Sequence, residues 1–404
     1  MRLTAMLATL LLSIASAAQA ETRAETNARF ADWLLQTVRP MAIEAGVSAE
    51  TFSATLGDVS LNWDLPGLRP PGWTPTAPNP QREFGPPARY FRGIEALARE
   101  GRGEYQRLSG TLEAIEARFG VPGHILVAIW GRETVYGRVD IPHPAFEVLA
   151  AHAFMGRDPE YQTRELIAAL QIAEARPVPL SRMRASWGGA MGQPQFVPSN
   201  YLDHGADGDG DGQIDIWGSG PDALASIARF LSDKGWVAGR DWGYEVRLPE
   251  GLSCANEGPD LARPLADWQA LGVARISGRP FPQAEEAGEM SLLLPAGVKG
   301  PAFLVTPNFY VLKRYNVSDL YALFVGNLGD RIAYGSGGFT APWIDIGQMT
   351  RGEIATLQEG LIATGLDTGG ADGLPGFRTR RAIGKWQETR GEAPTCFPAP
   401  GMGG

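Results

Sequence analysis

The chain has 404 residues, of which 36 are basic and 45 acidic, so its formal net charge is −9 at pH 7. This acidic balance argues against binding to nucleic acid or to an anionic membrane surface. Glycine (51 residues) and proline (31 residues) are plentiful but follow no period, which predicts long loops and excludes a fibrous repeat.

The first twenty residues have the pattern of a secretory signal peptide. Arg2 precedes an apolar run at 3–17, and residues 18–20 (Ala-Gln-Ala) offer a cleavage site between small side chains. The run is short for a membrane span, and Glu21 stands where a lipid anchor would need cysteine. We therefore expect residues 1–20 to be removed and the exported chain to have no membrane anchor.

After cleavage, about 380 residues would remain, which exceeds one typical hydrophobic core and predicts two or three domains. Cys254 and Cys396 are the two cysteines of the chain. In an oxidising compartment they could form one disulfide between a late insertion and the C-terminal tail. Two unpaired thiols are the alternative, and the sequence leaves both open.

The order of elements predicts an α+β protein that is mainly helical. Apolar side chains recur at helical spacing in six segments: 30–42, 105–119, 123–132, 159–175, 222–234 and 315–332. A loop rich in proline and tryptophan is expected at 62–87. Short apolar stretches broken by glycine and proline predict a partly β insertion at about 242–311. A linker at 335–342 then leads to a separate C-terminal unit.

Residues 207–215 form a ladder of aspartates with glycines between them, which is a pattern typical of calcium loops. The candidate ligands are Asp207, Asp209, Asp211, Gln213 through its backbone carbonyl, and Asp222. Gly212 stands at the sixth position, where such a loop turns sharply. The twelfth position is Gly218, where a standard loop has a bidentate glutamate. The segment is therefore either a longer loop closed by Asp222 or a solvated acidic turn.

Glu133 is the first candidate for catalysis. On a helix that starts near residue 123, Ile125, Ile129 and Glu133 follow one another on the same face. Apolar neighbours disfavour a charged carboxylate, so the pKa of Glu133 should be raised, as a general acid for a glycosidic oxygen requires. The alternative is an ordinary glutamate at a helix end, paired with Arg132 or Arg138.

A second candidate segment covers residues 186–199. Small residues at 188–190 and 192 would let the backbone approach a ligand closely. Its polar side chains could hydrogen-bond sugar hydroxyls or amides: Ser186, Gln193 and Gln195. Trp187 and Phe196 offer faces for stacking. A tight helix-packing segment has the same composition, so both interpretations stay open.

Four ordered blocks resemble the membrane-bound lytic transglycosylase B family: 131–137, 189–199, the ladder at 207–215, and 308–316. The resemblance covers roughly residues 25–340. It implies a lysozyme-like, mainly helical catalytic domain at 21–340 with a small β subdomain. It also implies non-hydrolytic cleavage of the MurNAc–GlcNAc bond of peptidoglycan, which leaves 1,6-anhydro-MurNAc ends. Since the anchoring cysteine is absent, the chain looks like a soluble relative in a Gram-negative periplasm.

The resemblance also assigns roles to individual residues. Glu133 takes the position of the single catalytic acid/base. Five residues match glycan-binding positions: Ser186, Gln195, Tyr315, Asn316 and Tyr321. The aspartate ladder with Asp222 matches the calcium loop of the family, which is also longer than a standard one. The sequence departs from the family at Gln193 and Pro194, where Tyr-Gly is typical, and at Phe230, where tyrosine is usual.

The C-terminal segment 346–392 resembles a peptidoglycan-binding domain 1, a small helical bundle that anchors wall hydrolases. The matching residues are Leu357, Gln358, Leu361, Gly365, Asp372, Gly373, Gly376, Thr379, Ala382, Ile383, Trp386 and Gln387. Leu357 and Leu361 should pack against Ala382, Ile383 and Trp386. Peptidoglycan strands are thus the expected partner, and other cell-wall enzymes are further candidates.

The expected mechanism uses one carboxyl twice. Protonated Glu133 would donate to the glycosidic oxygen while the 2-acetamido group of the substrate stabilises the charge at C1. The ionised Glu133 would then take the proton of the C6 hydroxyl, which closes onto C1. A standard glycosidase needs a second carboxylate, and the sequence shows no obvious partner. The alternatives are a hydrolytic muramidase and a non-catalytic, calcium-stabilised wall-binding protein. No organic cofactor is expected.

Overall fold

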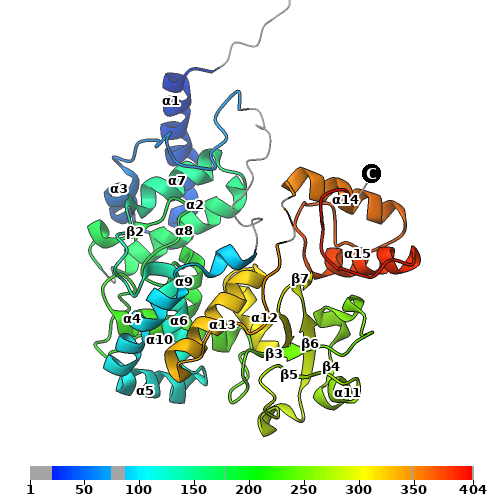
Figure 1. Cartoon of the computed structure of the whole chain (residues 1–404). Helices are drawn as coiled ribbons and strands as arrows, with labels where there is room; N and C mark the ends of the chain where they lie inside the picture. Colours follow the sequence, from blue (N-terminus) through cyan, green and yellow to red (C-terminus); the bar gives the residue numbers. More distant parts are fainter. Residues whose placement is uncertain (1–20, 74–86, 177, 346, 348, 403–404) are drawn as a thin grey trace, which may run out of the picture.

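The computed structural model describes residues 21–73, 87–176, 178–345, 347 and 349–402. The predicted signal peptide at 1–20 and residues 74–86 of the predicted proline-rich loop lie outside this range. Among the described helices, none combines the length and the apolar character that a membrane span requires. Helices form one side of the molecule, and a small sheet with two C-terminal helices forms the other (Figure 1).

The N-terminal layer consists of α1 (Arg23–Trp33), the π-helical turn η1 (Leu34–Val38), α2 (Arg39–Glu44) and α3 (Ala49–Leu56). It packs on a helical hairpin formed by α7 (Ala145–Met155) and α8 (Pro159–Ala175). The single helix predicted at 30–42 is therefore part of a longer, interrupted one. Pro40 lacks a backbone N–H, so the ladder of hydrogen bonds is disturbed just before it, where the π-turn lies. Phe30, Leu149 and Leu166 are buried in the shared core.

A second core surrounds one central helix. Its elements are α4 (Ile94–Arg107), α5 (Ser109–Phe119), α6 (Gly123–Thr134), α9 (Pro198–His204), α10 (Gly220–Asp233), α12 (Pro307–Tyr315) and α13 (Asp319–Tyr334). Almost every residue of α6 is buried, including Ile125 and Ile129. Gly131 is required there because a Cβ would lie 2.6 Å from the ring of Tyr136.

The helix predicted at 315–332 exists, but its predicted first residue is wrong. Residues 307–315 form α12, the helix is interrupted at 316–318, and α13 begins at Asp319. The break has a local cause, since the Ser318 side chain accepts from the N–H of Tyr321 and caps α13. Tyr315 and Tyr321 therefore lie on two different helices. The predicted helix 105–119 is likewise divided at Leu108, between α4 and α5.

The strands of the main sheet fall inside the expected insertion. They are β3 (Gly243–Arg247), β4 (Arg263–Pro264), β5 (Ala274–Arg275), β6 (Glu289–Leu293) and β8 (Ala302–Val305), in the antiparallel order β4-β6-β8-β3-β5. Leu292, Leu304 and Tyr244 lie side by side across three strands and pack on Trp268. Short elements complete the structure: β1 (His143–Pro144), β2 (Arg184–Ala185), β7 (Pro295–Val298), α11 (Leu265–Ala270), η3 (Pro87–Phe91), η4 (Leu180–Arg182), η5 (Cys254–Asn256), η6 (Pro259–Leu261) and η7 (Gln283–Glu285).

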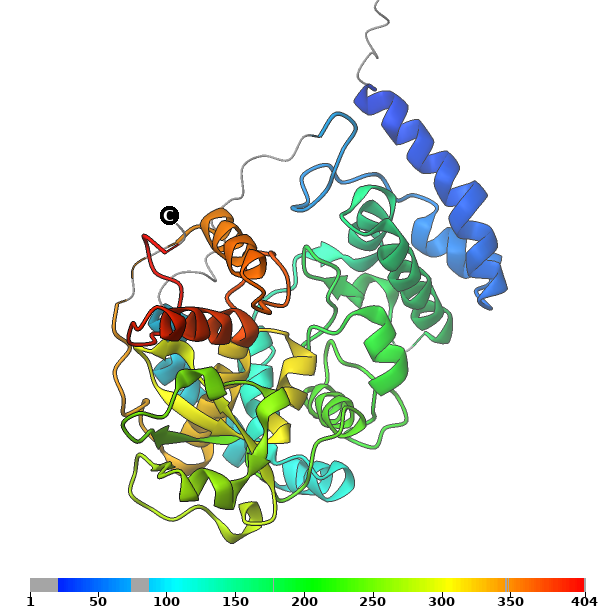
Figure 2. The same cartoon turned by 90° about the vertical axis from the view of Figure 1, so that its right-hand side faces the viewer.

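The C-terminal unit contains α14 (Arg351–Ala363) and α15 (Phe377–Thr389). Its small core joins Leu357, Leu361, Ala382 and Ile383, with Trp386 against it, which confirms the predicted one-face contacts. Both views place these helices beside the sheet and away from α1 (Figure 1, Figure 2). The unit is thus attached to the β insertion rather than standing apart.

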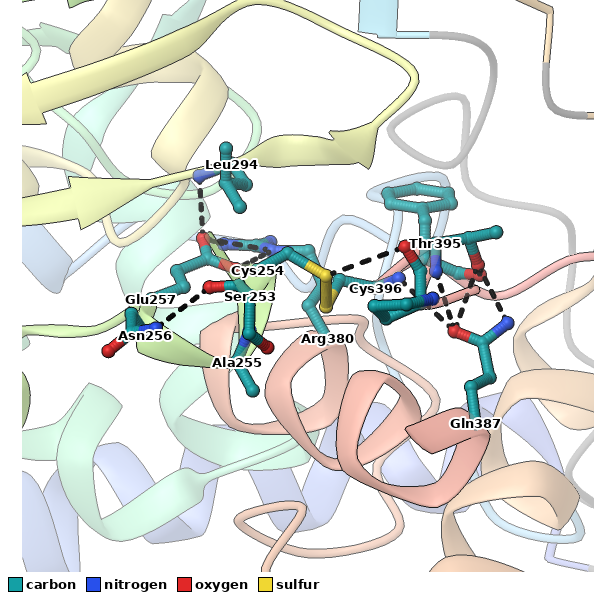
Figure 3. The surroundings of a disulfide bond; sticks show 12 residues. Ser253, Cys254, Ala255, Asn256, Glu257, Leu294, Arg380, Gln387, Thr395 and Cys396 are labelled. Atoms are coloured by element: carbon teal, nitrogen blue, oxygen red, sulfur yellow. Dashed lines mark hydrogen bonds and ion pairs between the residues drawn. A yellow bond between two sulfur atoms is a disulfide. The ribbon is translucent and has the colours of Figure 1, made fainter. Parts of the chain in front are cut away.

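A disulfide joins Cys254 in η5 to Cys396 in the C-terminal tail, with their Cα atoms 6.1 Å apart (Figure 3). Gly384 of α15 makes room for it, since a Cβ there would lie 2.3 Å from the Cys396 Sγ. The tail continues beside β7, where the Val298 N–H donates to the Thr395 carbonyl at 3.0 Å. Of the two alternatives that the sequence left open, the structure has the bridge.

Removal of this bridge should destabilise the C-terminal half. The bond closes a segment with a sequence separation of 142 residues, so replacing both cysteines by serine should cost about 2–5 kcal/mol in free energy of unfolding. Thermal melts of the double variant and the wild type, both oxidised, measure the difference. As a control, reductant should lower the melting temperature of the wild type only. Equal melting temperatures for the two proteins would contradict this role.

Candidate active site

Glu133 lies in the last turn of α6, directly before an unusual helix end. Val135, Tyr136 and Gly137 follow one another with φ of 51°, 61° and 75°. For the two residues with side chains, this left-handed backbone costs about 1–2 kcal/mol each. Strain of this kind persists only where neighbouring contacts enforce it. The end of α6 is therefore held in place by the surrounding structure.

Three contacts enforce that backbone. The hydroxyl of Tyr136 donates to the Leu97 carbonyl of α4 at 2.7 Å, and its ring packs edge-on against Trp130 at 5.6 Å. Gly137 lies so close to the neighbouring loop that a Cβ would be 2.5 Å from the Gln193 Oε1. The block 131–137 is thus fitted to α4 on one side and to the loop before α9 on the other.

The Glu133 carboxyl is held by one strong hydrogen bond. The hydroxyl of Tyr321, on α13, donates to Glu133 Oε1 at 2.6 Å. Tyr321 is only 2% exposed, whereas the Glu133 side chain keeps partial access to solvent. The carboxyl is therefore oriented from one side and accessible from another, as a group that exchanges protons with a substrate needs to be.

Burial raises the pKa of the Glu133 carboxyl above its usual range. The hydrogen bond from Tyr321 and the Arg132 guanidinium both act in the opposite direction, but burial outweighs them. Arg132 lies over the rings of Tyr90 and Phe324, at 4.7 Å from each centroid. The direction predicted from the apolar face of the helix is confirmed.

A second tyrosine supports Tyr321. The rings of Tyr315 and Tyr321 are stacked, with centroids 6.3 Å apart and planes at 7°. The Tyr315 hydroxyl donates to the Pro194 carbonyl at 2.5 Å, so it joins α12 to the loop before α9. Burial raises the pKa of both tyrosines well above the usual range, which keeps both hydroxyls protonated as donors. Asn316 follows Tyr315 on the exposed surface.

The segment 186–196 is a compact, hydrogen-bonded loop. Met191 and Phe196 exchange two backbone hydrogen bonds, of 2.7 and 3.0 Å. Gln195 between them has a left-handed φ of 54°, and its side-chain amide donates to the Gly192 carbonyl at 3.0 Å. Ser186 Oγ accepts from the N–H of Ala190 at 3.2 Å. Gln195 and Ser186 are both partly exposed, and their contact with glycan stays a prediction.

Gln193 has internal partners for its whole side chain. Its Oε1 accepts from the Trp130 indole at 2.7 Å, and its Nε2 donates to the Trp217 carbonyl at 3.1 Å. Its backbone carbonyl accepts from the Thr134 hydroxyl at 2.9 Å, and only 7% of the residue is exposed. The structure therefore gives Gln193 the task of attaching the loop to α6, and its contact with sugar stays a prediction.

The aspartate ladder folds into a tight loop before α10. One carboxylate oxygen from each of Asp207, Asp209 and Asp211 lies within 4.8 Å of the other two. The backbone N–H groups of Gly212 and Gly210 donate to Asp207 and lower its pKa, so this carboxylate stays ionised. Both glycines have positive φ (80° for Gly210 and 86° for Gly212), which the turn requires.

Asp222 closes the loop from α10. It is 1% exposed, and its two carboxylate oxygens accept from the N–H of Gly208 at 2.8 Å and of Asp215 at 2.7 Å. It is not part of the three-aspartate cluster, and Gln213 is exposed at the far end of the loop. The predicted closure by Asp222 is therefore achieved through backbone hydrogen bonds, while its binding to an ion stays a prediction.

The comparison with known families gives one match along most of the chain. The family model described as "Transglycosylase SLT domain" matches residues 29–330, a range that includes Glu133, both tyrosines and the aspartate loop. The chain belongs to the transglycosylase SLT domain family. The C-terminal unit begins beyond the matched residues.

Individual relatives of this transglycosylase SLT domain agree with that assignment. Membrane-bound lytic murein transglycosylase B of Escherichia coli (strain K12) is 33% identical over 221 residues, which are 53% of this chain and 58% of the relative. This chain thus aligns with less than two thirds of that curated relative. Crystalline SltB3 from Pseudomonas aeruginosa, in complex with NAG-anhNAM-pentapeptide, is 36% identical with a TM-score of 0.81. That alignment covers 92% of this chain and 98% of SltB3.

A third relative is Escherichia coli Slt35 in complex with calcium, which is 28% identical with a TM-score of 0.53. It covers 63% of this chain and 80% of Slt35. Together the matches confirm the predicted fold class, a mainly helical, lysozyme-like α+β fold.

The hydrogen bond between Tyr321 and Glu133 in this transglycosylase SLT domain was not predicted from the sequence. The hydroxyl of Tyr321 donates to Glu133, which is 188 residues away in the chain, and the contact with glycan that the resemblance assigns to Tyr321 stays a prediction. Nothing in the local sequence indicates that pair. For Gln193 a signal was present, because Trp130 and Thr134 lie one turn apart beside Glu133, and both carry donors that need partners.

Proposed function

We propose that this protein is a lytic transglycosylase that cleaves the MurNAc–GlcNAc bond of peptidoglycan without water. The observation that carries the proposal is the Glu133 carboxyl, which has a raised pKa and is oriented by the Tyr321 hydroxyl at 2.6 Å. A carboxyl whose pKa is raised keeps its proton to higher pH, which suits a general acid for a leaving oxygen. The relatives named as lytic transglycosylase, and SltB3 with its anhydro-sugar ligand, support the same reaction.

The proposed reaction uses Glu133 in two consecutive steps. Its proton moves to the glycosidic oxygen as the bond from that oxygen to C1 of MurNAc breaks. The 2-acetamido group of the same sugar stabilises the positive charge at C1. The Glu133 carboxylate then takes the proton of the C6 hydroxyl, and the C6 oxygen bonds to C1. The hydrogen bond from Tyr321 favours the carboxylate that exists between the two steps.

The surroundings of Glu133 favour a single acid/base. Across the described residues, the influences on its pKa are burial, Tyr321 and Arg132, and no second carboxyl is among them. A hydrolase with two carboxylates would place the second one about 5–10 Å from the first. We therefore keep the non-hydrolytic reaction as the proposal, and the released products distinguish it from a hydrolytic muramidase.

The mass of the products tests this proposal. Purified peptidoglycan sacculi incubated with the enzyme should release muropeptides with 1,6-anhydro-MurNAc ends, which lack the mass of one water. Reducing ends that carry the added water would identify a hydrolytic muramidase instead. If the protein bound sacculi but released no muropeptide, it would be a non-catalytic wall-binding protein.

We also propose that the aspartate loop binds Ca²⁺ in a structural role. Three converging carboxylates suit a hard cation that prefers oxygen ligands, and Asp207, Asp209 and Asp211 would hold it with the Gln213 carbonyl. The loop leads from α9 into α10, and its neighbour Ile216 packs against Gly192 of the loop 186–196. The ion would therefore stabilise the wall beside Glu133 and take no part in the chemistry.

Calcium should raise the melting temperature of the protein. At a free concentration of about 100 times its dissociation constant, an ion that binds only the folded state adds about 2.7 kcal/mol. Thermal melts in Ca²⁺ and in EDTA measure this effect. Asp209→Asn should lose most of it, whereas Asp203→Asn, an exposed residue before the loop, should keep it. If EDTA abolished turnover without lowering the melting temperature, the division between stability and chemistry would be wrong.

The remaining expectations form part of the same proposal. The unit 346–392 would bind peptidoglycan, as supported by the small core that its resemblance predicted. Ile362 and Leu374 are exposed apolar side chains of that unit, so replacing both by serine should reduce sedimentation with sacculi. The chain would be exported to the periplasm after loss of residues 1–20, which cell fractionation and N-terminal sequencing test.

A further inference from the structure

Charged side chains and a cavity lie at the seam between the C-terminal unit and the helical side of the molecule. A cavity of about 440 Å³ lies along it, lined among others by Lys313, Asp319, Arg380 and Phe377. Apolar packing across this seam is therefore incomplete. α15 packs on the turn η5, beside the disulfide, and one of its side chains reaches α13.

That side chain is Arg380 of α15. Its guanidinium donates to both oxygens of Glu257, with a shortest distance of 2.6 Å from Nη2 to Oε1 (Figure 3). Nη2 also lies 2.9 Å from Asp319 Oδ2, and Nη1 donates to the Pro375 carbonyl at 2.7 Å. Arg380 is 3% exposed and Glu257 is fully buried. Removing one partner of an ion pair this deep is strongly destabilising, because the other charge is left buried and uncompensated.

Asp319 connects this pair to the active site. It is the first residue of α13, and its other oxygen, Oδ1, lies 2.6 Å from the Lys313 ammonium of α12. Tyr321 follows Asp319 by two residues, and Tyr315 follows Lys313 by two. The ion pairs therefore lie at the facing ends of α12 and α13, directly beside the stacked tyrosines that contact Glu133 and Pro194.

We propose that Arg380 is a positioning residue for catalysis: through Asp319 it fixes the start of α13, so that the Tyr321 hydroxyl is held on Glu133. The proposal rests on the proposed function, because it concerns the same carboxyl. It gives the C-terminal unit a second task besides wall binding. The link runs from Arg380 to Asp319 by an ion pair, along the first turn of α13, and from Tyr321 to Glu133 by a hydrogen bond.

The consequence is a change in the pH dependence of turnover. When α13 is no longer fixed at Asp319, Tyr321 donates to Glu133 less well, and the carboxylate loses the hydrogen bond that favours it. The pH at which activity falls as Glu133 ionises should therefore move upward. Misplacement of the donor should lower kcat by about tenfold, and KM should change less.

The test uses a charge-neutral double variant of the full chain, Arg380→Met with Glu257→Gln. Replacing both partners avoids a buried unpaired glutamate, and glutamine can still accept from the Leu294 N–H as Glu257 does. Lys313 and Asp319 keep their own pair. Turnover is measured against pH on short soluble GlcNAc–MurNAc oligosaccharides, so that wall binding does not enter the result.

The matched control is Arg381→Gln with Asp260→Asn. The Arg381 guanidinium lies 2.8 Å from the Asp260 carboxylate, and this neighbouring pair also joins α15 to the β insertion but does not reach α13. Its removal should leave the pH profile and kcat unchanged. Melting temperatures of both double variants separate a loss of stability from a loss of positioning.

A double-mutant cycle decides whether Arg380 acts through Tyr321. In a Tyr321→Phe background, the Arg380/Glu257 double substitution should have little further effect on kcat, since the hydroxyl that it positions is already gone. Equal losses in both backgrounds, or an unchanged pH profile in the wild-type background, would overturn the proposal. If the wild type itself released no anhydro product, the proposed function would fail instead.

Discussion

Glu133→Gln should abolish cleavage of peptidoglycan while the protein still sediments with sacculi. Glutamine has nearly the same shape and can accept the hydrogen bond from Tyr321, but it can neither donate a proton to the leaving oxygen nor take one from C6. Because one group performs both steps, we expect a loss of at least about 10³ in kcat. Release of soluble muropeptides over time, measured by mass spectrometry, gives the rate.

The control for this variant is Glu113→Gln, an exposed residue of α5, which should keep full activity. Turnover of Glu133→Gln at a rate comparable to the wild type would refute the assignment. So would a loss of sacculus binding together with activity, because the proposal separates the wall-binding unit from the acid/base.

Glu133→Gln should also change how the stability of the protein depends on pH. Burial raises the pKa of Glu133, so the folded protein holds this proton more tightly than the unfolded chain does. As pH rises from the ordinary glutamate pKa through the raised one, the wild type therefore loses stability. Glutamine does not titrate. Above this window Glu133→Gln should melt no lower than the wild type, which thermal melts at several pH values measure, and the inactive variant is then known to be folded.

Tyr321→Phe should have the second largest effect on catalysis. It removes a hydroxyl that donates to Glu133 Oε1 at 2.6 Å and leaves the ring stacked on Tyr315. Hydrogen bonds to a charged group contribute about 1.5–3 kcal/mol, so kcat should fall by roughly 10- to 100-fold. Since the lost bond lowers the pKa of Glu133, the pH at which activity declines should rise.

The matched control is Tyr334→Phe at the other end of α13, where the side chain is 69% exposed. It should keep both kcat and the pH profile. A Tyr321→Phe variant with an unchanged profile would show that the hydroxyl does not act on Glu133 during turnover. A shift toward lower pH would contradict the sign derived from the hydrogen bond.

The sequence was sufficient for features that depend on neighbouring residues along one helix or loop. The periodicity of Ile125, Ile129 and Glu133 predicted the helix and the raised pKa of the carboxyl, and both are confirmed. Leu357 and Leu361 were likewise placed correctly against Ala382, because one-face spacing in two helices leaves few ways to pack them.

The sequence was insufficient where two distant segments meet. The donor to Glu133 comes from α13, and the acceptor for Tyr315 from the loop before α9. The contacts of Gln193 with Trp130 and Trp217 were likewise not predicted. The helix start at 319 was missed since periodicity continues across 316–318, and only the capping bond of Ser318 marks the break. Such contacts follow from the tertiary fold.

The bond between Cys254 and Cys396 also bears on the order in which this protein matures. Synthesis proceeds from the N-terminus, so Cys254 has to wait for a partner that emerges 142 residues later. Until then α15 and Arg380 are also missing, although Glu133, Tyr321 and the aspartate loop are already present. If Arg380 positions Tyr321 as we propose, a partly synthesised chain that lacks α15 would be a poor catalyst. Full activity would then be reached only after the C-terminal unit has been made and attached.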